Sequence, residues 1–324
     1  MKKLIFLALF LINLVYGGEL VPNTIYKYTA VSAHGILVSN DVAAWEYIDL
    51  ANQIKPVQPG YQVSFKSIAY GNNKFVIVGS YGLVASSTDE VHWTTNYIPQ
   101  FTGTWLNSVV FYHGKFYANS NSTIYSSVDG ITWINQGSSN YLTKLAIANA
   151  SLYAIGSSKV MRLGSFGWTT VYEDKTNVID FRTISYGNNT YVVNSTNGTS
   201  TLTSIDGINW INHTAAMGYG PEGQSSIYID KFIVIKYLDP SQYCHYGSIS
   251  NDGLNWTFNT MTVNNTQGSY GWVYFIAYDN SIYIAGGGSN SPTILLSNDA
   301  IHWYSAILPA SHGSGFSLDI AIVK

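Results

Sequence analysis

The first candidates for chemistry are a serine and an aspartate that stand two residues apart in a glycine-containing stretch. Residues 126–133 read SSVDGITW, in which Asp129 follows Ser127 by two residues and precedes Trp133 by four. An aspartate in such a turn can ligate a metal, act as a catalytic carboxylate, or hold the turn through hydrogen bonds from backbone N–H groups. How often the motif recurs bears on which of these uses applies.

The motif occurs six times with the same internal spacing. In each copy a Ser stands six residues before a Trp, and an Asp stands four residues before it. The copies are SNDVAAW (39–45), STDEVHW (87–93), SVDGITW (127–133), SIDGINW (204–210), SNDGLNW (250–256) and SNDAIHW (297–303). A seventh, degenerate copy is RLGSFGW (162–168), where Arg162 and Gly164 occupy the Ser and Asp positions. Recurrence of one motif along the chain indicates a repeated structural unit.

The segments between the motifs repeat as well, and they predict the fold. FKSIAYGNNKFVIVGS (65–80) aligns with FRTISYGNNTYVVNST (181–196), and both read as two strands joined by a tight turn. Each unit therefore contains four antiparallel strands, which we name a to d from the innermost outwards, with the motif between c and d. The first unit lacks strand a, and residues 316–324 supply one. The sequence predicts an all-β, seven-bladed propeller of four-stranded antiparallel blades, closed by its C-terminal strand.

The N-terminus predicts export. Lys2 and Lys3 precede an apolar run over residues 4–15, and Gly17 and Gly18 follow it, which is the pattern of a secretory signal. We therefore expect a signal peptide over residues 1–18 and a single propeller domain over residues 19–324. The apolar run is too short for a membrane span of about 20 residues. The expected location is secreted or periplasmic, with no membrane insertion.

Composition narrows the partners. The chain carries 15 Lys and Arg against 18 Asp and Glu and has no basic patch, which argues against nucleic acid as a partner. Cys244 is the single cysteine, so no intrachain disulfide is expected. One carboxylate in each isolated turn offers too few oxygens for calcium, which takes six to eight. We expect no metal, no cofactor and a monomeric protein.

The repeated motif resembles the Asp-box, or BNR, repeat of the sialidase-like β-propellers and their non-catalytic relatives. The resemblance covers roughly residues 24–324. It implies that the motif fixes turns on the rim, away from the ligand site, and the bonding capacity of Ser and Asp oxygens agrees with that role. The aspartates expected to be structural are Asp41, Asp89, Asp129, Asp206, Asp252 and Asp299.

Sialidase activity itself is not expected. The resembled enzymes clamp a sugar carboxylate with three arginines, and they add a Tyr–Glu nucleophile pair and an acid/base Asp. This chain has only two arginines, Arg162 and Arg182, and Arg162 occupies a rim position. The absent arginine triad favours a non-catalytic member and therefore a binding protein over an enzyme.

Strand order sorts the loops onto two faces. The a–b and c–d turns share one face, and the longer b–c and d–a loops share the other, where we expect a glycan or protein ligand to bind. Lys66 and Arg182 hold the same repeat position at the start of strand a, so both are expected near the mouth of the central channel, where they could attract an anionic group or remain solvated. The candidate ligand-binding residues on this face are Arg182, Lys66, Tyr219, Tyr237, Tyr243 and Trp272.

Paired carboxylates on the same face leave a second function open. Glu222 and Asp239 lie on loops flanking the sixth blade, with His245 nearby in sequence, and two carboxyl groups at a defined distance can hydrolyse a glycosidic bond. The alternative is thus a carbohydrate-active hydrolase or lyase, and a third reading is a scaffold without a small ligand. A glycoprotein is also open, because eight Asn-x-Ser/Thr sites occur, at Asn121, Asn149, Asn188, Asn194, Asn197, Asn212, Asn255 and Asn264.

Overall fold

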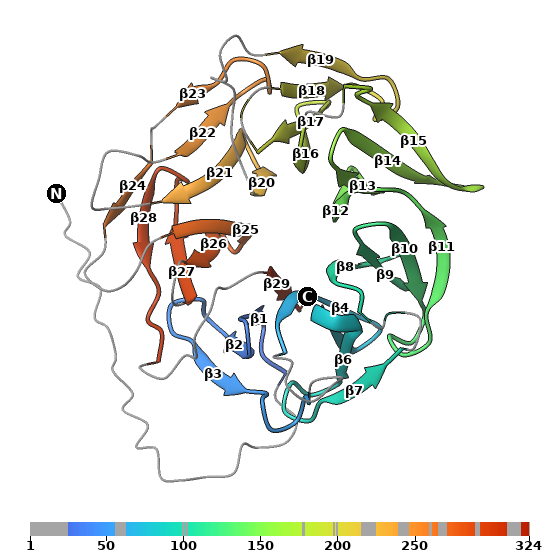
Figure 1. Ribbon diagram of the computed structural model, residues 1–324. Coiled ribbons are helices and arrows are strands. Elements are labelled where there is room, and N and C mark those ends of the chain that lie inside the picture. Colours follow the sequence, from blue (N-terminus) through green and yellow to red (C-terminus); the bar gives the residue numbers. More distant parts are fainter. Residues whose placement is uncertain are drawn as a thin grey trace, which may run out of the picture.

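The chain forms successive antiparallel sheets that stand around a central axis (Figure 1). The structure is a computed structural model, and it describes residues 25–55, 63–98, 101, 103–176, 179–196, 198, 200–214, 225–238, 246–258, 261–264, 271–288, 292–309 and 319–323. The sheets are the seven four-stranded blades that the repeats predict. Blades 6 and 7 are also joined to each other through a short pairing of their strands β21 and β25.

Each blade runs from an inner strand a to an outer strand d. Blade 1 contains β29 (Asp319–Ile322), β1 (Tyr28–Val31), β2 (Gly35–Ser39) and β3 (Glu46–Asp49). Blade 2 contains β4 (Phe65–Gly71), β5 (Lys74–Gly79), β6 (Leu83–Ser87) and β7 (Thr94–Tyr97), with a short 3-10 turn, η1 (Ser80–Gly82), between β5 and β6. Blade 3 contains β8 (Leu106–Tyr112), β9 (Lys115–Ser120), β10 (Thr123–Ser127) and β11 (Ile134–Ser138).

The remaining blades follow the same plan. Blade 4 contains β12 (Leu142–Ala148), β13 (Ser151–Gly156), β14 (Lys159–Gly164) and β15 (Gly167–Glu173), and blade 5 contains β16 (Phe181–Gly187), β17 (Thr190–Ser195), β18 (Ser200–Ser204) and β19 (Ile211–Thr214). Blade 6 contains β20 (Ser225–Tyr228), β21 (Phe232–Leu238), β22 (Tyr246–Ser250) and β23 (Thr257–Phe258). Blade 7 contains β25 (Gly271–Asp279), β26 (Ile282–Gly288), β27 (Pro292–Ser297) and β28 (His302–Ser305), and β24 (Thr262–Asn264) runs parallel to β28.

The C-terminal strand closes the ring. β29 pairs antiparallel with β1 over four residues, from Asp319 opposite Val31 to Ile322 opposite Tyr28. In Figure 1, β29 lies at the centre beside β1, so the two ends of the described chain meet in one blade. The predicted closure is confirmed, and β29 completes blade 1 as its innermost strand.

The hydrophobic core lies between blades rather than within them. Middle strands are buried on both faces, as in β2 and β18, because a neighbouring blade covers each side. The motif tryptophan packs against the preceding blade: Trp93 joins a cluster containing residues of blades 1 and 2, and Trp303 joins one of blades 6 and 7. Trp303 has no exposed surface, and burying such a side chain stabilises the fold by about 3 kcal/mol or more.

In blades 1, 7 and 2 the preceding connector forms hydrogen bonds with the start of the outer strand, an arrangement that we name the connector clasp. In blade 1, Ile307 N–H donates to the Ala43 carbonyl over 2.8 Å, and Trp45 N–H donates to the Ile307 carbonyl over 3.0 Å. In blade 7, β24 supplies the same kind of backbone contact, with Thr262 N–H donating to the Ile301 carbonyl over 2.7 Å. The preceding connector thus adds a peptide group to the edge of each of these outer strands.

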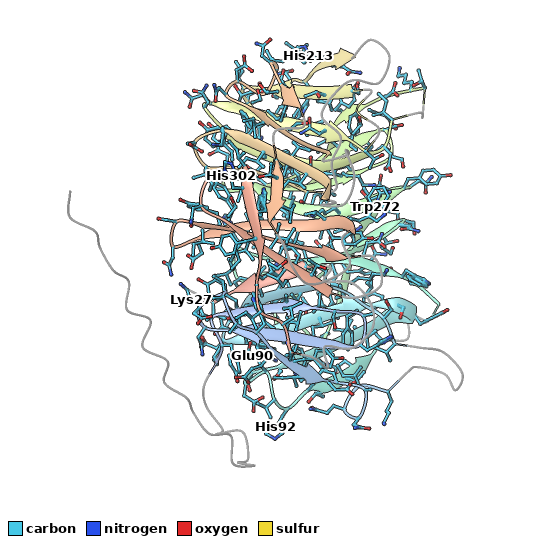
Figure 2. All side chains as sticks on the ribbon, turned by 90° about the vertical axis from the view of Figure 1, so that its left-hand side faces the viewer. Lys27, Glu90, His92, His213, Trp272 and His302 are labelled. Atoms are coloured by element: carbon cyan, nitrogen blue, oxygen red, sulfur yellow. The ribbon has the colours of Figure 1, made fainter. Side chains whose placement is uncertain are left out.

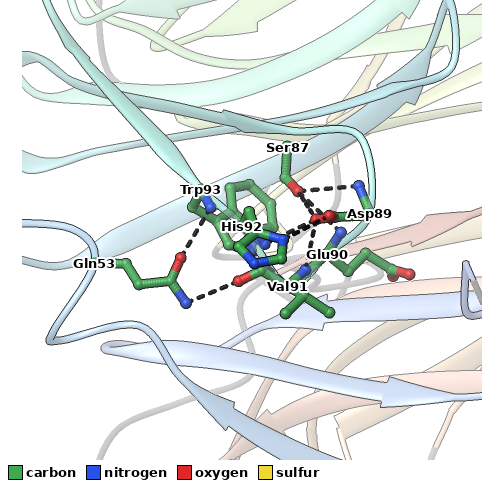
Figure 3. A network of polar contacts seen from close by, with 7 residues as sticks. All are labelled: Gln53, Ser87, Asp89, Glu90, Val91, His92 and Trp93. Carbon is green, nitrogen blue, oxygen red and sulfur yellow. Dashed lines mark hydrogen bonds and ion pairs between the residues drawn. The ribbon is translucent and has the colours of Figure 1, made fainter. Parts of the chain in front are cut away.

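In blade 2 a side chain replaces that peptide group. Gln53, in the connector after β3, donates from Nε2 to the Val91 carbonyl over 2.8 Å and accepts from Trp93 N–H at Oε1 over 2.9 Å (Figure 3). A carboxamide has the same donor and acceptor pair as a peptide unit, so it satisfies the same two backbone groups. The clasp therefore does not depend on the connector backbone reaching the strand.

In the part of the chain that the structure describes, no helix is long and apolar enough to cross a membrane. Within the same residues, no three His, Cys, Asp or Glu side chains gather as metal ligands.

Candidate ligand-binding site

The Ser-x-Asp turns have one bonding pattern. In the copy in blade 3, Asp129 Oδ1 accepts from Ile131 N–H over 2.8 Å and from Thr132 N–H over 2.7 Å. Ser127 Oγ donates to the same carboxylate over 2.8 Å and accepts from Gly130 N–H over 2.8 Å. Asp41, Asp89, Asp206, Asp252 and Asp299 make the corresponding bonds in their own turns.

In Asp129 these bonds all go to one carboxylate oxygen, Oδ1, from inside the turn. Burial raises the pKa of Asp129, but the hydrogen bonds from Thr132, Ile131 and Ser127 outweigh it and lower the pKa to about 2. An anion held by several N–H donors inside one turn is committed to that turn. In blade 4, where Ser and Asp are missing, a plain hairpin pairs Gly164 with Gly167 and exposes Phe166 fully at its tip.

The residue after the Asp adopts a left-handed backbone whether or not it is glycine. Its φ is 73° at Gly130 but also 63° at Val42, 62° at Glu90 and 62° at Ala300. A Cβ on Gly130 would lie 2.6 Å from a Val76 methyl group in the preceding blade, so this position points into the gap between blades. Turns with a side chain here accept backbone strain of about 1 kcal/mol and fill that gap.

Glu90 places a carboxyl group in such a gap. Its side chain has no exposed surface, Oε2 accepts from Tyr26 N–H over 2.7 Å, and Thr29 Oγ1 donates to Oε1. Burial raises the pKa of Glu90 to about 7, against the opposing effect of the hydrogen bonds from Thr29 and Tyr26. The group therefore joins blade 2 to blade 1 and titrates near neutral pH.

A cavity opens at the mouth of the central channel, on the face of the d–a connectors. Its volume is about 360 Å³, and residues of six blades line it. Trp105, in the connector before β8, and Asn121, in the b–c loop of blade 3, place it on the predicted ligand face. Figure 2 shows that face from the side: Trp272 lies there, and Lys27 and His302 lie toward the opposite face.

A β-bulge at one repeat position builds the wall of this cavity. In β4 the pairing steps from Phe65 to Ser67, which leaves Lys66 as an inserted residue. The same step occurs in β8, β12, β16 and β25. The inserted residues, which we name the bulge ring, are Lys66, Asn107, Thr143, Arg182 and Tyr274, and all five line the cavity. Bulges turn side chains away from the ladder, and they are common beside binding sites.

In blades 2 and 3 the residue after the bulge joins neighbouring inner strands. Ser67 Oγ accepts from Val109 N–H over 3.0 Å, and Ser108 Oγ accepts from Leu145 N–H over 2.7 Å. Asp319 of β29 takes the same place in blade 1 and accepts from Ser67 Oγ over 2.5 Å. These side chains, with Lys144 at the equivalent position of blade 4, form what we name the stitch ring.

Three cations face the cavity, and their partners differ. Arg182 donates from Nε and Nη2 to Oδ2 of Asp180, over 2.9 and 2.8 Å. Lys66 lies over the Trp105 ring, with Nζ 5.3 Å from the ring centre, and burial lowers its pKa. Burial likewise lowers the pKa of Lys144, which the carboxylate of Asp319 opposes.

Aromatic side chains complete one side of the cavity. Trp105 is 42% exposed, and its ring centre lies 5.6 Å from that of Tyr81 in the b–c turn of blade 2. Tyr274 faces the cavity from blade 7. Rings beside amide and hydroxyl groups offer both flat apolar contact and directional hydrogen bonds to a ligand.

The structure brings together some of the residues singled out from the sequence. Lys66 and Arg182 line one cavity, as their shared repeat position predicts, while a role for them in binding stays a prediction. Trp272 is 39% exposed, and its backbone pairs with that of Tyr237. The remaining ligand and catalytic candidates lie outside the described residues, namely Tyr219, Tyr243, Glu222, Asp239 and His245.

Sequence reasoning placed Trp105 on the ligand face but missed Lys144 and Asp319 as parts of the same site. Aligning the openings of the inner strands, FKS, LNS, LTK and FRT, would have placed Lys144 beside Lys66 and Arg182. Among the potential glycosylation sites, Asn121 lines the cavity, whereas the Asn194 side chain is fully buried and therefore not accessible to a glycan on this face.

A known family model matches one part of the chain. Residues 39–178 match the model of the DUF6242 beta propeller domain. Part of this chain is similar to that domain. The matched stretch runs from the end of β2 to the connector after β15, and so reaches from blade 1 through blade 4. The search of curated proteins found no match to this sequence.

Solved structures share the fold at low identity. A structure titled YCF48 bound to D1 peptide is 15% identical with a TM-score of 0.52, covering 75% of this chain and 80% of that one. Virginiamycin B lyase from Staphylococcus aureus is 12% identical with a TM-score of 0.56, covering 74% and 83%. YCF48 from Cyanidioschyzon merolae is 16% identical with a TM-score of 0.51, covering 74% and 84%. Likeness at this level establishes the propeller fold alone.

Substituting Asp129 tests the Ser-x-Asp turn. Asp129→Ala removes an acceptor of three hydrogen bonds and should lower the free energy of unfolding by about 1–3 kcal/mol, measured by chemical denaturation. Because its pKa is depressed, the contribution is present above the ordinary pKa of 3.8 and is lost as pH falls through about 2. Asp129→Asn keeps an acceptor oxygen and should lose less, and equal stability of Asp129→Ala and the parent would contradict a structural role.

Glu90 should make stability depend on pH near neutrality. Its folded pKa of about 7 exceeds the ordinary 4.5, so stability is full below 4.5 and falls as pH rises through 7, by roughly 3 kcal/mol at most. Glu90→Gln keeps the shape and removes the titration. Denaturation curves at several pH values should show the variant gaining on the parent between pH 5 and 8, whereas a constant difference would exclude this effect.

Proposed function

We propose that this protein is an exported recognition propeller that binds a protein or glycan ligand at the channel-mouth cavity and the loops around it. The observation that carries the proposal is the bulge ring, in which five inner strands turn a side chain into one cavity by the same irregularity. Regular pairing would serve a purely structural ring, so a bulge at each of these positions favours a binding surface.

The features of the cavity fit recognition. Its rigid walls come from inner strands, which cuts the ordering cost of binding, and its lining mixes aromatic rings, amides, hydroxyls and cations. A peptide ligand is supported by one structure with a similar fold, that of YCF48 bound to D1 peptide. The six Ser-x-Asp turns further support kinship with non-catalytic Asp-box propellers.

The alternative remains a carbohydrate-active hydrolase or lyase. It rests on Glu222, Asp239 and His245, which lie outside the described residues. In the cavity that is described, Asp319 is the only lining carboxylate, and it accepts hydrogen bonds from Ser67 and Ile68. Binding is therefore the function that the described geometry favours.

Screening tests the proposal. The chain from residue 19 onward should bind members of a peptide or glycan array, and Trp105→Ala should weaken the affinity for any hit by about tenfold or more, since central aromatic residues dominate binding energy. Phe166→Ala is the matched control, because this fully exposed ring lies on the rim hairpin of blade 4 and should leave the affinity unchanged. Absence of any peptide or glycan ligand, or equal effects of both substitutions, would overturn the proposal.

A further inference from the structure

We propose that the floor of the channel-mouth cavity is an anion site, in which Lys144, assisted by Lys66 and Arg182, holds a carboxylate or phosphate group of the ligand. This inference rests on the proposed binding function and names the chemistry that the site recognises. Four observations on the inner strands support it.

The charges in the cavity are not balanced by its own carboxylates. Arg182 is paired with Asp180, but Lys66 and Lys144 make no ion pair among the described residues. Lys66 has only the face of Trp105 beside its ammonium group. Ammonium groups removed from bulk water without a carboxylate in ion-pair contact are costly, and an anionic ligand would supply that contact.

The one carboxylate in the lining is already committed. Asp319 Oδ2 accepts from Ser67 Oγ over 2.5 Å and from Ile68 N–H over 3.3 Å, while Oδ1 accepts from Ile320 N–H over 2.9 Å. These bonds tie the closing strand to blade 2. They also fix the position of the Asp319 carboxylate. Asp319 therefore acts on Lys144 through its charge and does not form an ion pair with it.

Lys144 also contributes no acceptor at its position of the stitch ring. At this position Asp319, Ser67 and Ser108 each accept a backbone N–H from the next blade. The equivalent residues of blades 5 and 7, Thr183 and Phe275, do not. An ammonium group only donates, so Lys144 has no capacity to accept from β16. Lys144 therefore takes no part in joining the inner strands through an acceptor, and it lines the cavity instead.

The three cations come from the inner strands of blades 2, 4 and 5 and occupy two successive positions of the repeat. Lys66 and Arg182 belong to the bulge ring and Lys144 to the stitch ring, one residue further along strand a. Because the bulge turns the inserted residue toward the same side as the residue after it, all three reach one cavity of about 360 Å³. Ammonium groups suit compact anions, and the amide of Asn121, which Asn107 Nδ2 holds through Oδ1 over 2.7 Å, adds a donor beside them.

The test uses inorganic phosphate and acetate as probes, glucose as a neutral probe, and calorimetry in low-salt buffer with the chain from residue 19 onward. The parent should bind at least one of the two anions and not glucose, and added salt should weaken binding. Lys144→Met should lower the affinity for that anion by about tenfold or more, and Lys66→Met should lower it less. Lys115→Met is the control of equal charge change, because Lys115 is exposed on β9 at the opposite face.

Stability separates a binding role from a structural one. Lys144→Met removes a poorly solvated charge, so its melting temperature should equal or exceed that of the parent, and Lys144→Arg should retain anion binding. A loss of melting temperature in Lys144→Met that accounts for the lost binding, or unchanged anion affinity in that variant, would overturn the anion site. If Lys144→Met does not fold, the anion site would be overturned by two results together: unchanged anion affinity in Lys66→Met and loss of anion binding in Lys144→Arg.

The outcomes for the two proposals differ. A peptide or glycan that binds Lys144→Met as tightly as the parent would leave the recognition function standing and remove the anion site. Lysine-dependent binding of phosphate or acetate, without any peptide or glycan ligand, would do the reverse. Comparison of the two anions distinguishes a phosphorylated ligand from a carboxylate-bearing one.

Discussion

Stacking of blades is the constraint on which this structure depends. A blade with two apolar faces has no stable existence alone, so each sheet must find a neighbour on both sides, and the last blade must meet the first. The motif tryptophans fill the joints, as Trp93 and Trp303 show, and β29 completes the first blade with residues from the far end of the chain. The first blade is therefore complete only with the C-terminal strand in place.

The same constraint explains the division of labour among polar residues. On the rim, Ser-x-Asp turns and connector clasps satisfy backbone groups where outer strands begin, and their carboxylates are consumed by that task. Around the channel, side chains such as Ser67 and Ser108 satisfy backbone groups of the next blade. Lys144 stands at an equivalent position, cannot accept a hydrogen bond, and lines the cavity.

Much of the architecture follows from the sequence because it is periodic. Seven copies of one motif, one of them degenerate, determine the blade count, the strand order and the assignment of loops to two faces. The shared register of Lys66 and Arg182 places both at the channel mouth. The bulges do not follow from it, since an inserted residue looks like any other until the pairing is known. Contacts such as Gln53 with Trp93 link residues 40 apart through one side-chain amide, and no local pattern announces them.

The bulge ring has a consequence for how such a protein diversifies. An inserted residue takes no part in the strand ladder, so pairing constrains its identity little, although Asn107 and Thr143 among the five also donate to a backbone carbonyl of the next blade. The five bulges carry Lys, Asn, Thr, Arg and Tyr, chemically unlike residues on one backbone device. Natural selection, or a designed combinatorial library, can substitute these five residues and change which ligand the channel mouth binds while the propeller backbone stays the same.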